Sequence, residues 1–214
     1  GVAEVERLSK LKRFFSPQLA DLIVSGGTED PLKSRRREIV VVYLDLRGFT
    51  AFAETTEPEE LMRTLGDYHA AMGRIVLAHE ATLERFTGDG MMVFLGDPVP
   101  VEHAAEKGVR LALEMRDAAK ELSARWKKRG VDLGLAIGVA QGYATVGAIG
   151  FEGRIDYGAI GTVTNLAARL CQQARGSEIL LSQRVYAEVS EVVETEDMGE
   201  LTLHGFARPQ HAYR

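Results

Sequence analysis

The sequence predicts an α+β fold, in which a sheet that contains antiparallel strands carries helices on one face. A continuous β-branched and apolar run at residues 39–44 indicates a strand buried on both faces. Segments 58–79 and 101–128 show helical periodicity and alternate with strand-like runs. Two of these runs, 81–86 and 91–95, flank a Gly-Asp-Gly turn and indicate a hairpin. The order strand, helix, hairpin, helix, strand predicts a ferredoxin-like βαββαβ core.

Residues 1–37 differ in character from the rest of the chain. Ser16-Pro17 is a helix-start signal and Gly26-Gly27 a stop signal. We expect the basic triplet 35–37 to be a solvated linker ahead of the first strand. Apolar residues recur here at helical spacing: Val5, Leu8, Phe15, Leu19 and Leu22. We therefore predict a helical signalling linker over 1–37, which leads from an upstream domain that this sequence lacks, and a folded domain over 38–214.

The elements after the second long helix are predicted to be shorter. Runs 133–140 and 144–149 indicate a second pair of strands. The segment 162–173 indicates a third helix, which starts after Gly161 and closes before Gly176. Three short candidate strands follow, at 179–181, 192–195 and 201–203. These last elements extend the predicted core at its C-terminal end.

Composition narrows the class of protein. The chain has 214 residues, of which 45% are hydrophobic and 27% are charged, as in a globular domain with a core. A net charge of −5 argues against sequence-independent binding to nucleic acid and against binding to an anionic membrane. The single cysteine, Cys171, excludes a disulfide framework and a cysteine-built zinc site. We expect a cytoplasmic location and no membrane contact by this segment.

Two acidic residues lie at positions where a charged side chain is unfavourable unless it has a partner. Asp45 ends the most apolar strand, between two leucines, and Asp89 lies at the tip of the predicted hairpin. If the two strands are neighbours, both carboxylates reach one end of the sheet and repel each other unless a cation lies between them. Such oxygen ligands suit Mg²⁺. The alternative for Asp89 is a plain turn residue, whereas a strand-terminal Asp45 needs a partner.

Two further segments could contact phosphate groups. The chain turns at Gly48 into a predicted helix, so the backbone amides of Gly48, Phe49 and Thr50 form a candidate anion site. Asn165 and Arg169 are spaced i, i+4 and share one helix face, where they could stabilise charge on a phosphate. The alternative for this pair is an exposed, solvated face. No Walker loop occurs in the sequence.

Taken together, segments 45–50, 86–90 and 160–170 resemble the three signature segments of class III nucleotide cyclases, in order, across residues 38–214. The resemblance implies an adenylate or guanylate cyclase catalytic domain that forms a homodimer with active sites at the subunit interface. It also implies that residues 1–37 carry signals from a regulatory domain.

The resemblance assigns roles to individual residues. Asp45 and Asp89 would hold two divalent metal ions, Mg²⁺ or Mn²⁺, with help from the Leu46 carbonyl. Asn165 and Arg169 would act from the opposite subunit on the ribose and on the α-phosphate. Thr50 and the backbone amides next to it would hold the terminal phosphates.

Two positions depart from the family pattern. Purine cyclases usually carry a base-reading Lys or Glu four residues before the second metal aspartate, and this sequence has Arg85 there. They carry a polar residue seven before the asparagine, where this sequence has Gly158. We expect Gly158 to leave a gap in the base pocket, with Asp156 or the backbone of Gly158 and Ala159 as the substitute contacts.

The sequence therefore predicts a nucleotide cyclase, with adenylate cyclase first, that converts ATP to 3′,5′-cyclic AMP and pyrophosphate by two-metal in-line attack. One alternative is a non-catalytic or weakly active nucleotide-binding and dimerisation module of the same fold. Another is a cyclase for GTP or for a pyrimidine triphosphate. A diguanylate cyclase or a polymerase-like palm is disfavoured, because the hairpin carries Thr-Gly-Asp-Gly instead of Gly-Gly-Asp/Glu-Glu-Phe.

Overall fold

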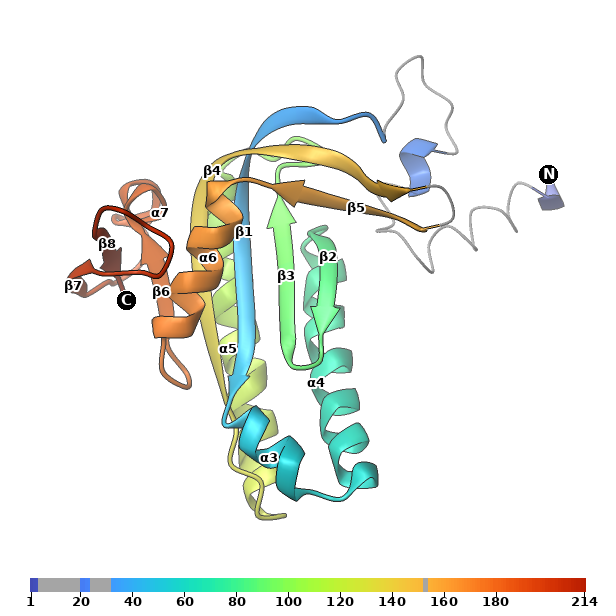
Figure 1. The fold of residues 1–214 in the computed structure, drawn as a ribbon, viewed down its shortest axis with the longest axis vertical. Helices are drawn as coiled ribbons and strands as arrows, with labels where there is room; N and C mark the ends of the chain where they lie inside the picture. Colours follow the sequence, from blue (N-terminus) through green and yellow to red (C-terminus); the bar gives the residue numbers. More distant parts are fainter. Residues whose placement is uncertain (4–19, 24–31, 152–153) are drawn as a thin grey trace.

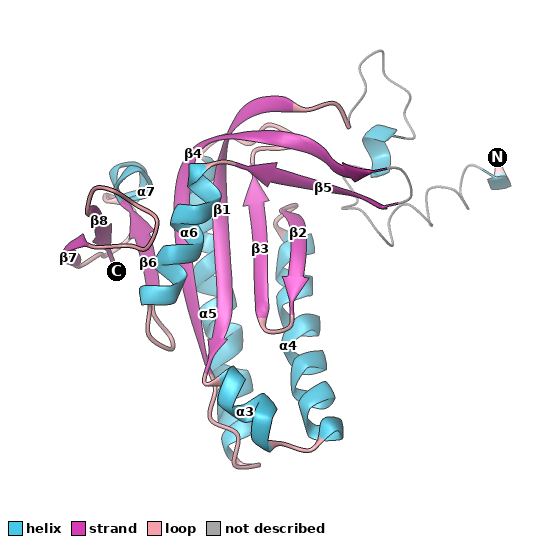
Figure 2. Cartoon of the chain, viewed as in Figure 1, coloured by secondary structure: helices cyan, strands magenta, loops and turns pink. Residues whose placement is uncertain are grey.

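The computed structural model describes residues 1–3, 20–23, 32–151 and 154–214. Within these ranges the chain builds an eight-stranded sheet with helices packed on it (Figures 1 and 2). The strands are β1 Arg35–Arg47, β2 Thr82–Thr87, β3 Gly90–Leu95, β4 Gly134–Phe151, β5 Arg154–Ile160, β6 Ile179–Ser182, β7 Asp197–Leu201 and β8 Gln210–Tyr213. The helices are α3 Phe49–Thr55, α4 Pro58–Ala78, α5 Ala104–Lys127, α6 Thr162–Gln173 and α7 Gln183–Val189.

The core of the sheet has the order β2-β3-β1-β4, and each neighbouring pair in it is antiparallel. With α4 between β1 and β2, and α5 between β3 and β4, this is the βαββαβ arrangement. The predicted α+β, ferredoxin-like fold class is confirmed. Beyond β4 the sheet continues through β6, β8 and β7, and β6 runs parallel to β4.

Strand β1 is buried on both of its faces, and helices cover both faces of the sheet. Val42, Leu44 and alternate neighbours pack with α4 and α5 in one core cluster, whereas Ile39 and Val41 pack with residues of α6 in another. Figure 1 shows α6 in front of the sheet and α4 and α5 behind it. The expectation of helices on one face only is therefore wrong. The reason lies in the unbroken apolar run of β1, which needs cover on either side.

Several predicted boundaries are confirmed. The third predicted helix coincides with α6 at both ends, and the first long helix matches α4 within a residue. The predicted hairpin is β2 and β3, which pair directly with each other. These segments carried the strongest periodicity or the clearest turn signal, so local sequence decided them.

The first half of the sheet is longer than expected. The basic triplet, expected in a solvated linker, forms the start of β1 and pairs with residues 144–146 of β4. Because this partner continues, β4 runs unbroken from Gly134 to Phe151, where two strands had been predicted. Its far half pairs with β5, a strand that the sequence analysis missed. The β4–β5 hairpin, here called the arm, bends across the top of the sheet in Figure 1.

The C-terminal region differs most from the prediction. The run 179–181 is confirmed as part of β6, but 192–195 forms no strand. The predicted strand at 201–203 overlaps β7 only at Leu201, the last residue of β7. Helix α7 and strand β8 were missed, and both are short enough that tertiary packing outweighs local pattern.

Most of the predicted N-terminal linker lies outside the described residues. Of its apolar positions only Leu22 is described, and its side chain is exposed. Ala20 is fully buried, and Ile23 and Leu32 pack on the core cluster beside α6. No helix of the described residues is both long and apolar enough to cross a membrane.

Candidate active site

The two predicted metal aspartates meet at one end of the sheet. Because β3 pairs with β1, the turn after β2 brings Asp89 beside the end of β1. The Asp89 carboxylate accepts a hydrogen bond from the backbone N–H of Leu46 at 3.2 Å, next to Asp45. The described residues hold no group of three or more His, Cys, Asp or Glu side chains arranged for a metal ion. The candidate site consequently rests on two carboxylates and on the backbone between them.

The hairpin turn that carries Asp89 is held from α4. The Tyr68 hydroxyl donates to the Asp89 carbonyl at 2.7 Å, and the His69 imidazole contacts the Gly88 carbonyl at 2.9 Å. Tyr68 is fully buried, and this burial together with the charges of Asp89 and Asp45 raises its pKa well above the usual value. The Tyr68 hydroxyl therefore stays protonated and remains a donor.

Arg47 is a site residue that the sequence analysis missed. Its guanidinium donates to both carboxylate oxygens of Asp45, at 3.0 and 3.2 Å. It also donates to the Ala174 carbonyl at 2.8 Å and to the Cys171 carbonyl. Residues two apart on a strand share a face, so the spacing of Asp45 and Arg47 was a signal that could have found this contact. Arg47 thereby ties the Asp45 carboxylate to the C-terminal end of α6.

The charges at this end of the sheet do not balance. Burial raises the pKa of Asp45, the Arg47 guanidinium opposes this, and the Asp89 carboxylate raises the pKa further. The net direction is upward, so one guanidinium does not compensate burial and a second carboxylate. A divalent cation would supply the missing positive charge.

The donor atoms at this end also fit such a cation. In an extended strand the N–H and C=O of one residue point to the same side. Since the Leu46 N–H points to Asp89, its carbonyl lies on that side too. The donor set of Asp45, Asp89 and the Leu46 carbonyl is all oxygen, which Mg²⁺ and Mn²⁺ prefer.

The predicted phosphate-binding turn leads from β1 into α3. Gly48 has φ 88°, in the left-handed region, and a Cβ there would lie 3.1 Å from the Asp132 carbonyl. No side chain caps the N-terminus of α3, and Thr50 is exposed. A cavity of about 450 Å³ opens beside Arg47 and Gly48, and Lys127 at the end of α5 also lines it. The backbone amides at the start of α3 are thus left without a side-chain acceptor.

Asn165 and Arg169 do not reach the carboxylates of their own chain. Helix α6 buries the face that includes Val163, Ala167 and Leu170 against the sheet. Asn165 is exposed on the other side, and Arg169 donates to Gln172 of the same helix at 3.0 Å. Within the described chain no hydrogen bond or ion pair joins either residue to Asp45 or Asp89. Both residues lie on one face of α6, as their spacing predicts, and their role is not decided by these contacts.

The two candidate base contacts lie on β2, which pairs with β3, and on β5, which pairs with β4. Arg85 follows a β-bulge and lies opposite Met92. The expected gap at Gly158 is absent, because Glu84 fills it: a Cβ on Gly158 would lie 3.1 and 3.2 Å from Glu84 side-chain carbons. The Glu84 carboxylate accepts from the Ala159 N–H at 3.2 Å.

The bulge explains why sequence alone did not find Glu84. It adds one residue to β2 between Leu83 and Arg85, so the alternation of side chains that a regular strand predicts is broken there. The third candidate contact, Asp156, is exposed and lies opposite Ile149 in the arm.

Comparison with known proteins decides the family. The family described as "Adenylate and Guanylate cyclase catalytic domain" matches residues 32–213. The chain belongs to this family. The prediction of a class III nucleotide cyclase domain, made from three short segments, is confirmed, as is the predicted enzyme class.

Relatives agree with this family. Adenylate cyclase 1 of Rhizobium meliloti is 28% identical over 173 residues, which cover 79% of this chain and 26% of that protein. The chain thus spans about a quarter of that relative's length. The crystal structure of the adenylyl cyclase CyaB from P. aeruginosa is 35% identical, with a TM-score of 0.82 over 85% of this chain and 95% of that chain. The guanylyl cyclase Cya2 is 30% identical, with a TM-score of 0.77 over 84% and 92%.

Proposed function

We propose that this cyclase domain converts ATP to 3′,5′-cyclic AMP and pyrophosphate. One observation carries the proposal: the Asp89 carboxylate contacts the backbone beside Asp45. Two carboxylates therefore lie close together and share one guanidinium, that of Arg47. Relatives named adenylate cyclase favour ATP, and the likeness to a guanylyl cyclase makes GTP the second candidate. We place this reaction in the cytoplasm, with residues 1–37 as the link to a regulatory domain.

Asp45, Asp89 and the Leu46 carbonyl would hold two divalent ions, Mg²⁺ or Mn²⁺. Bound there, such ions neutralise the triphosphate and lower the pKa of the ribose 3′-hydroxyl. Arg47 has a positioning role, because its bonds to Asp45 and to the end of α6 hold that carboxylate in one orientation. The amides of Gly48 and Phe49, with Thr50, would bind the terminal phosphates. Their freedom from a side-chain cap supports this assignment.

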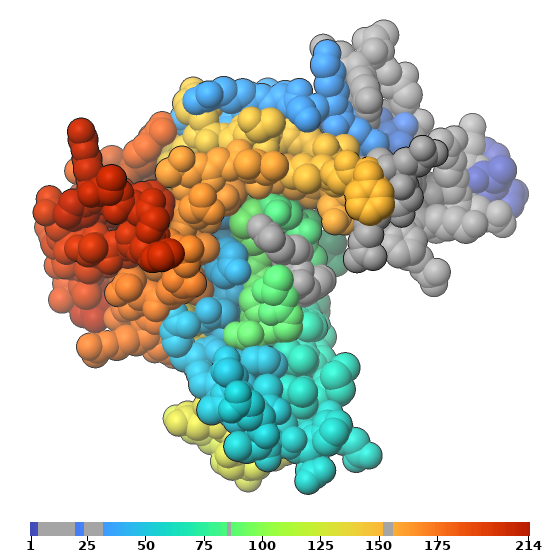
Figure 3. Space-filling view, viewed as in Figure 1, coloured from blue at the N-terminus to red at the C-terminus, as the bar shows by residue number. Residues whose placement is uncertain are grey.

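We propose a homodimer in which each site draws Asn165 and Arg169 from the partner subunit. Arg169 would stabilise negative charge on the α-phosphate in the transition state, and Asn165 would orient the ribose. Both side chains lie on the outer face of α6, away from the carboxylates of their own chain. The arm also exposes apolar side chains, as an interface requires: Tyr143, Ile149, Phe151 and Ile160. Figure 3 shows the arm, in yellow and orange, at the surface of the molecule.

The base pocket would combine Arg85 with Glu84, whose carboxylate stands where Gly158 offers no side chain. A carboxylate accepts hydrogen bonds only, so Glu84 selects bases that present an amino group. Adenine, guanine and cytosine carry an exocyclic amino group, whereas uracil offers only its ring N3–H. UTP is therefore expected to be the poorest of the four substrates.

The proposal is tested by incubating the purified chain with each of the four ribonucleoside triphosphates, in Mg²⁺ and in Mn²⁺, and separating the products by chromatography. We expect a 3′,5′-cyclic monophosphate and pyrophosphate, with ATP giving the highest kcat/KM. Release of nucleoside diphosphate and phosphate, or no product with either metal, would contradict it and favour a non-catalytic nucleotide-binding module.

The shared site is tested by complementation. Asp45→Ala and Arg169→Ala should each be inactive alone, whereas a 1:1 mixture should recover roughly a quarter of the wild-type activity, since each heterodimer rebuilds one of its two sites. The matched control mixes Asp45→Ala with Asp89→Ala, which damage the same half of each site and should recover nothing. Heterodimers that form without recovery would overturn the interface site.

A further inference from the structure

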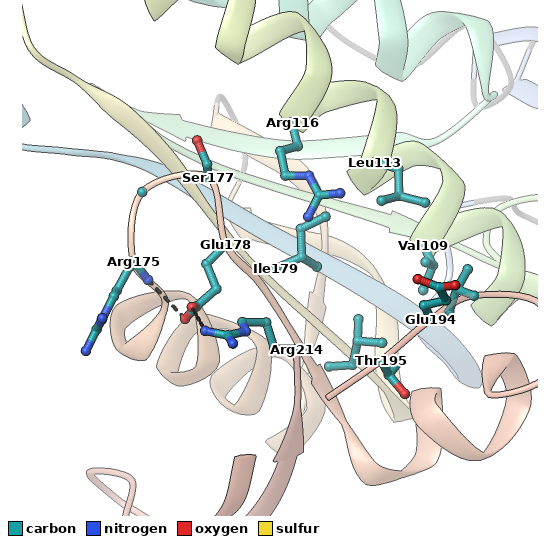
Figure 4. A pocket seen from close by; sticks show the side chains of 13 residues that line it. Val109, Leu113, Arg116, Arg175, Ser177, Glu178, Ile179, Glu194, Thr195 and Arg214 are labelled. Carbon is teal, nitrogen blue, oxygen red and sulfur yellow. Dashed lines mark hydrogen bonds and ion pairs between the residues drawn. The ribbon is translucent and has the colours of Figure 1, made fainter. Parts of the chain in front are cut away.

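A second cavity, of about 420 Å³, lies between α5, the loop that leads into β6, and the segment before β7 (Figure 4). It shares only Gly176 and Ser177 of that loop with the cavity beside Gly48. None of the proposed metal, phosphate, ribose or base residues lines it. Its volume falls within the range of roughly 300–1,000 Å³ that is typical of small-molecule sites.

The floor of this cavity is apolar. Val109 and Leu113 are one turn apart on α5, and Ile179 and Leu181 point from one face of β6, with Val193 beside them. These side chains offer an apolar body several contacts and no hydrogen-bond partner. A purely polar ligand would find no partners there.

One guanidinium nitrogen of the wall is buried without a hydrogen-bond partner in the part of the chain that the structure describes. Arg116 extends from α5 toward Ile179 in Figure 4, and its Nε is buried with no hydrogen-bond partner. Across the described ranges Arg116 makes no ion pair. Arg214 differs, because it is paired with Glu178 at 3.0 Å and with Glu196. The buried N–H of Arg116 therefore calls for an acceptor that the described residues do not supply.

The other charges of the lining limit what that acceptor is. Glu178 is half-buried and bound by Arg214, and the dashed contacts in Figure 4 also join it to the Arg175 backbone. Glu194 and the Arg175 side chain are exposed at the rim, where solvent screens them. A multiply charged phosphate would meet Glu178 and Glu194 as repulsive neighbours. A single negative charge, placed at Arg116, avoids most of that cost.

We propose that this cavity binds a small monocarboxylate with an apolar body. The carboxylate pairs with the Arg116 guanidinium, whose planar fork matches its two oxygens. The apolar body lies on the floor formed by α5 and β6. This binding does not depend on the proposed cyclase activity.

Isothermal titration calorimetry with octanoate, and with octan-1-ol as the uncharged probe, tests the proposal. The wild-type chain should bind octanoate at least about tenfold more tightly than octan-1-ol. Arg116→Met should bring octanoate to the affinity of the alcohol and leave the alcohol unchanged. Arg110→Met, the same substitution at an exposed position of α5, should alter neither.

A second variant separates shape from charge. Thr195→Trp fills the cavity from its rim and should abolish binding of both probes, while circular dichroism reports that the chain is folded. No octanoate binding by folded wild-type chain up to about 3 mM, equal affinity for the two probes, or equal octanoate binding by Arg116→Met and wild type would each overturn the site.

Discussion

The two ends of β1 each carry a cluster of acidic and basic side chains, and the clusters are built in opposite ways. At the C-terminal end, Asp45 and Asp89 share the single guanidinium of Arg47. At the N-terminal end one fully buried carboxylate, Asp97, receives two guanidinium groups and a phenol. Its partners are Arg35 at 2.9 Å, Arg37 at 3.4 Å and the hydroxyl of Tyr157.

The difference lies in the balance of charge. Around Asp97 two guanidinium groups and a phenol face one carboxylate, so the chain itself supplies that carboxylate with partners, although the Arg37 Nε accompanies it at 3.4 Å without a hydrogen bond. The cluster joins β1 to the segment after β3 and to the arm. Around Asp45 the carboxylates outnumber the cation, and burial together with the Asp89 carboxylate raises the pKa of Asp45 against the opposing effect of Arg47. A buried carboxylate with its own cations serves the fold, whereas two carboxylates that share one guanidinium could take a cation from solution, as proposed above.

The largest effect expected is on turnover at the unbalanced end. Asp45→Asn or Asp89→Asn should lower kcat about 1,000-fold, because each removes a charge proposed to hold the metals, a loss of about 4 kcal/mol. The free energy of unfolding should change by less than about 1 kcal/mol, since carboxylate repulsion is lost as well. Steady-state kinetics and urea denaturation measure the two quantities. Asp117→Asn, at an exposed position of α5, is the control, and near-normal turnover in either site variant would contradict the assignment.

The next effect concerns stability at the balanced end. Asp97→Ala should lower the free energy of unfolding by about 2–3 kcal/mol, because Arg35 and Arg37 lose their common anion. The expected loss is below that of a fully buried pair, since these arginine side chains are 25% and 42% exposed. Tyr157→Phe removes one hydrogen bond only and should cost about 1 kcal/mol. Urea denaturation measures both variants, and an Asp97→Ala chain as stable as wild type would show that the cluster contributes nothing.

The smallest effect concerns the base pocket. Glu84→Ala should lower the ratio of kcat/KM for ATP over that for UTP about tenfold, because a half-buried hydrogen-bond acceptor worth roughly 1–3 kcal/mol is lost. Glu121→Ala, at an exposed position of α5, should leave that ratio unchanged. If the ratio of kcat/KM for ATP over that for UTP is the same in Glu84→Ala and wild type, Glu84 does not contact the base, and the contact is assigned to Arg85 or to the backbone.

Sequence alone was sufficient where local pattern and tertiary environment agree. The limits of α6 follow from Gly161 and from an amphipathic stripe, and the pairing of β1 with β3 follows from a buried strand next to a hairpin. The same pairing brought Asp45 and Asp89 together as expected. The sequence therefore predicted the family and the meeting of the two carboxylates at one end of the sheet.

The remainder depends on contacts that no local pattern records. Strand β5 carries Gly158 and exists because β4 supplies a partner along its whole length. Glu84 reaches Gly158 only because a bulge interrupts β2. Arg35 and Arg37 resemble solvated linker residues in sequence. In the structure both pair with Asp97, which follows them in the chain by 62 and 60 positions. Which charged side chains lie close enough to compensate one another can be determined only after the fold is known.

Divalent-metal binding tests the contrast between the two clusters most directly. Electron paramagnetic resonance of Mn²⁺, titrated into the chain with a non-hydrolysable ATP analogue, reports the bound fraction without catalysis. We expect wild type and Asp97→Asn to bind Mn²⁺ alike, and Asp45→Asn to bind it at least about tenfold more weakly. Wild-type affinity in Asp45→Asn, or an equal loss in folded Asp97→Asn, would contradict the claim that the unbalanced end of β1 is the metal site.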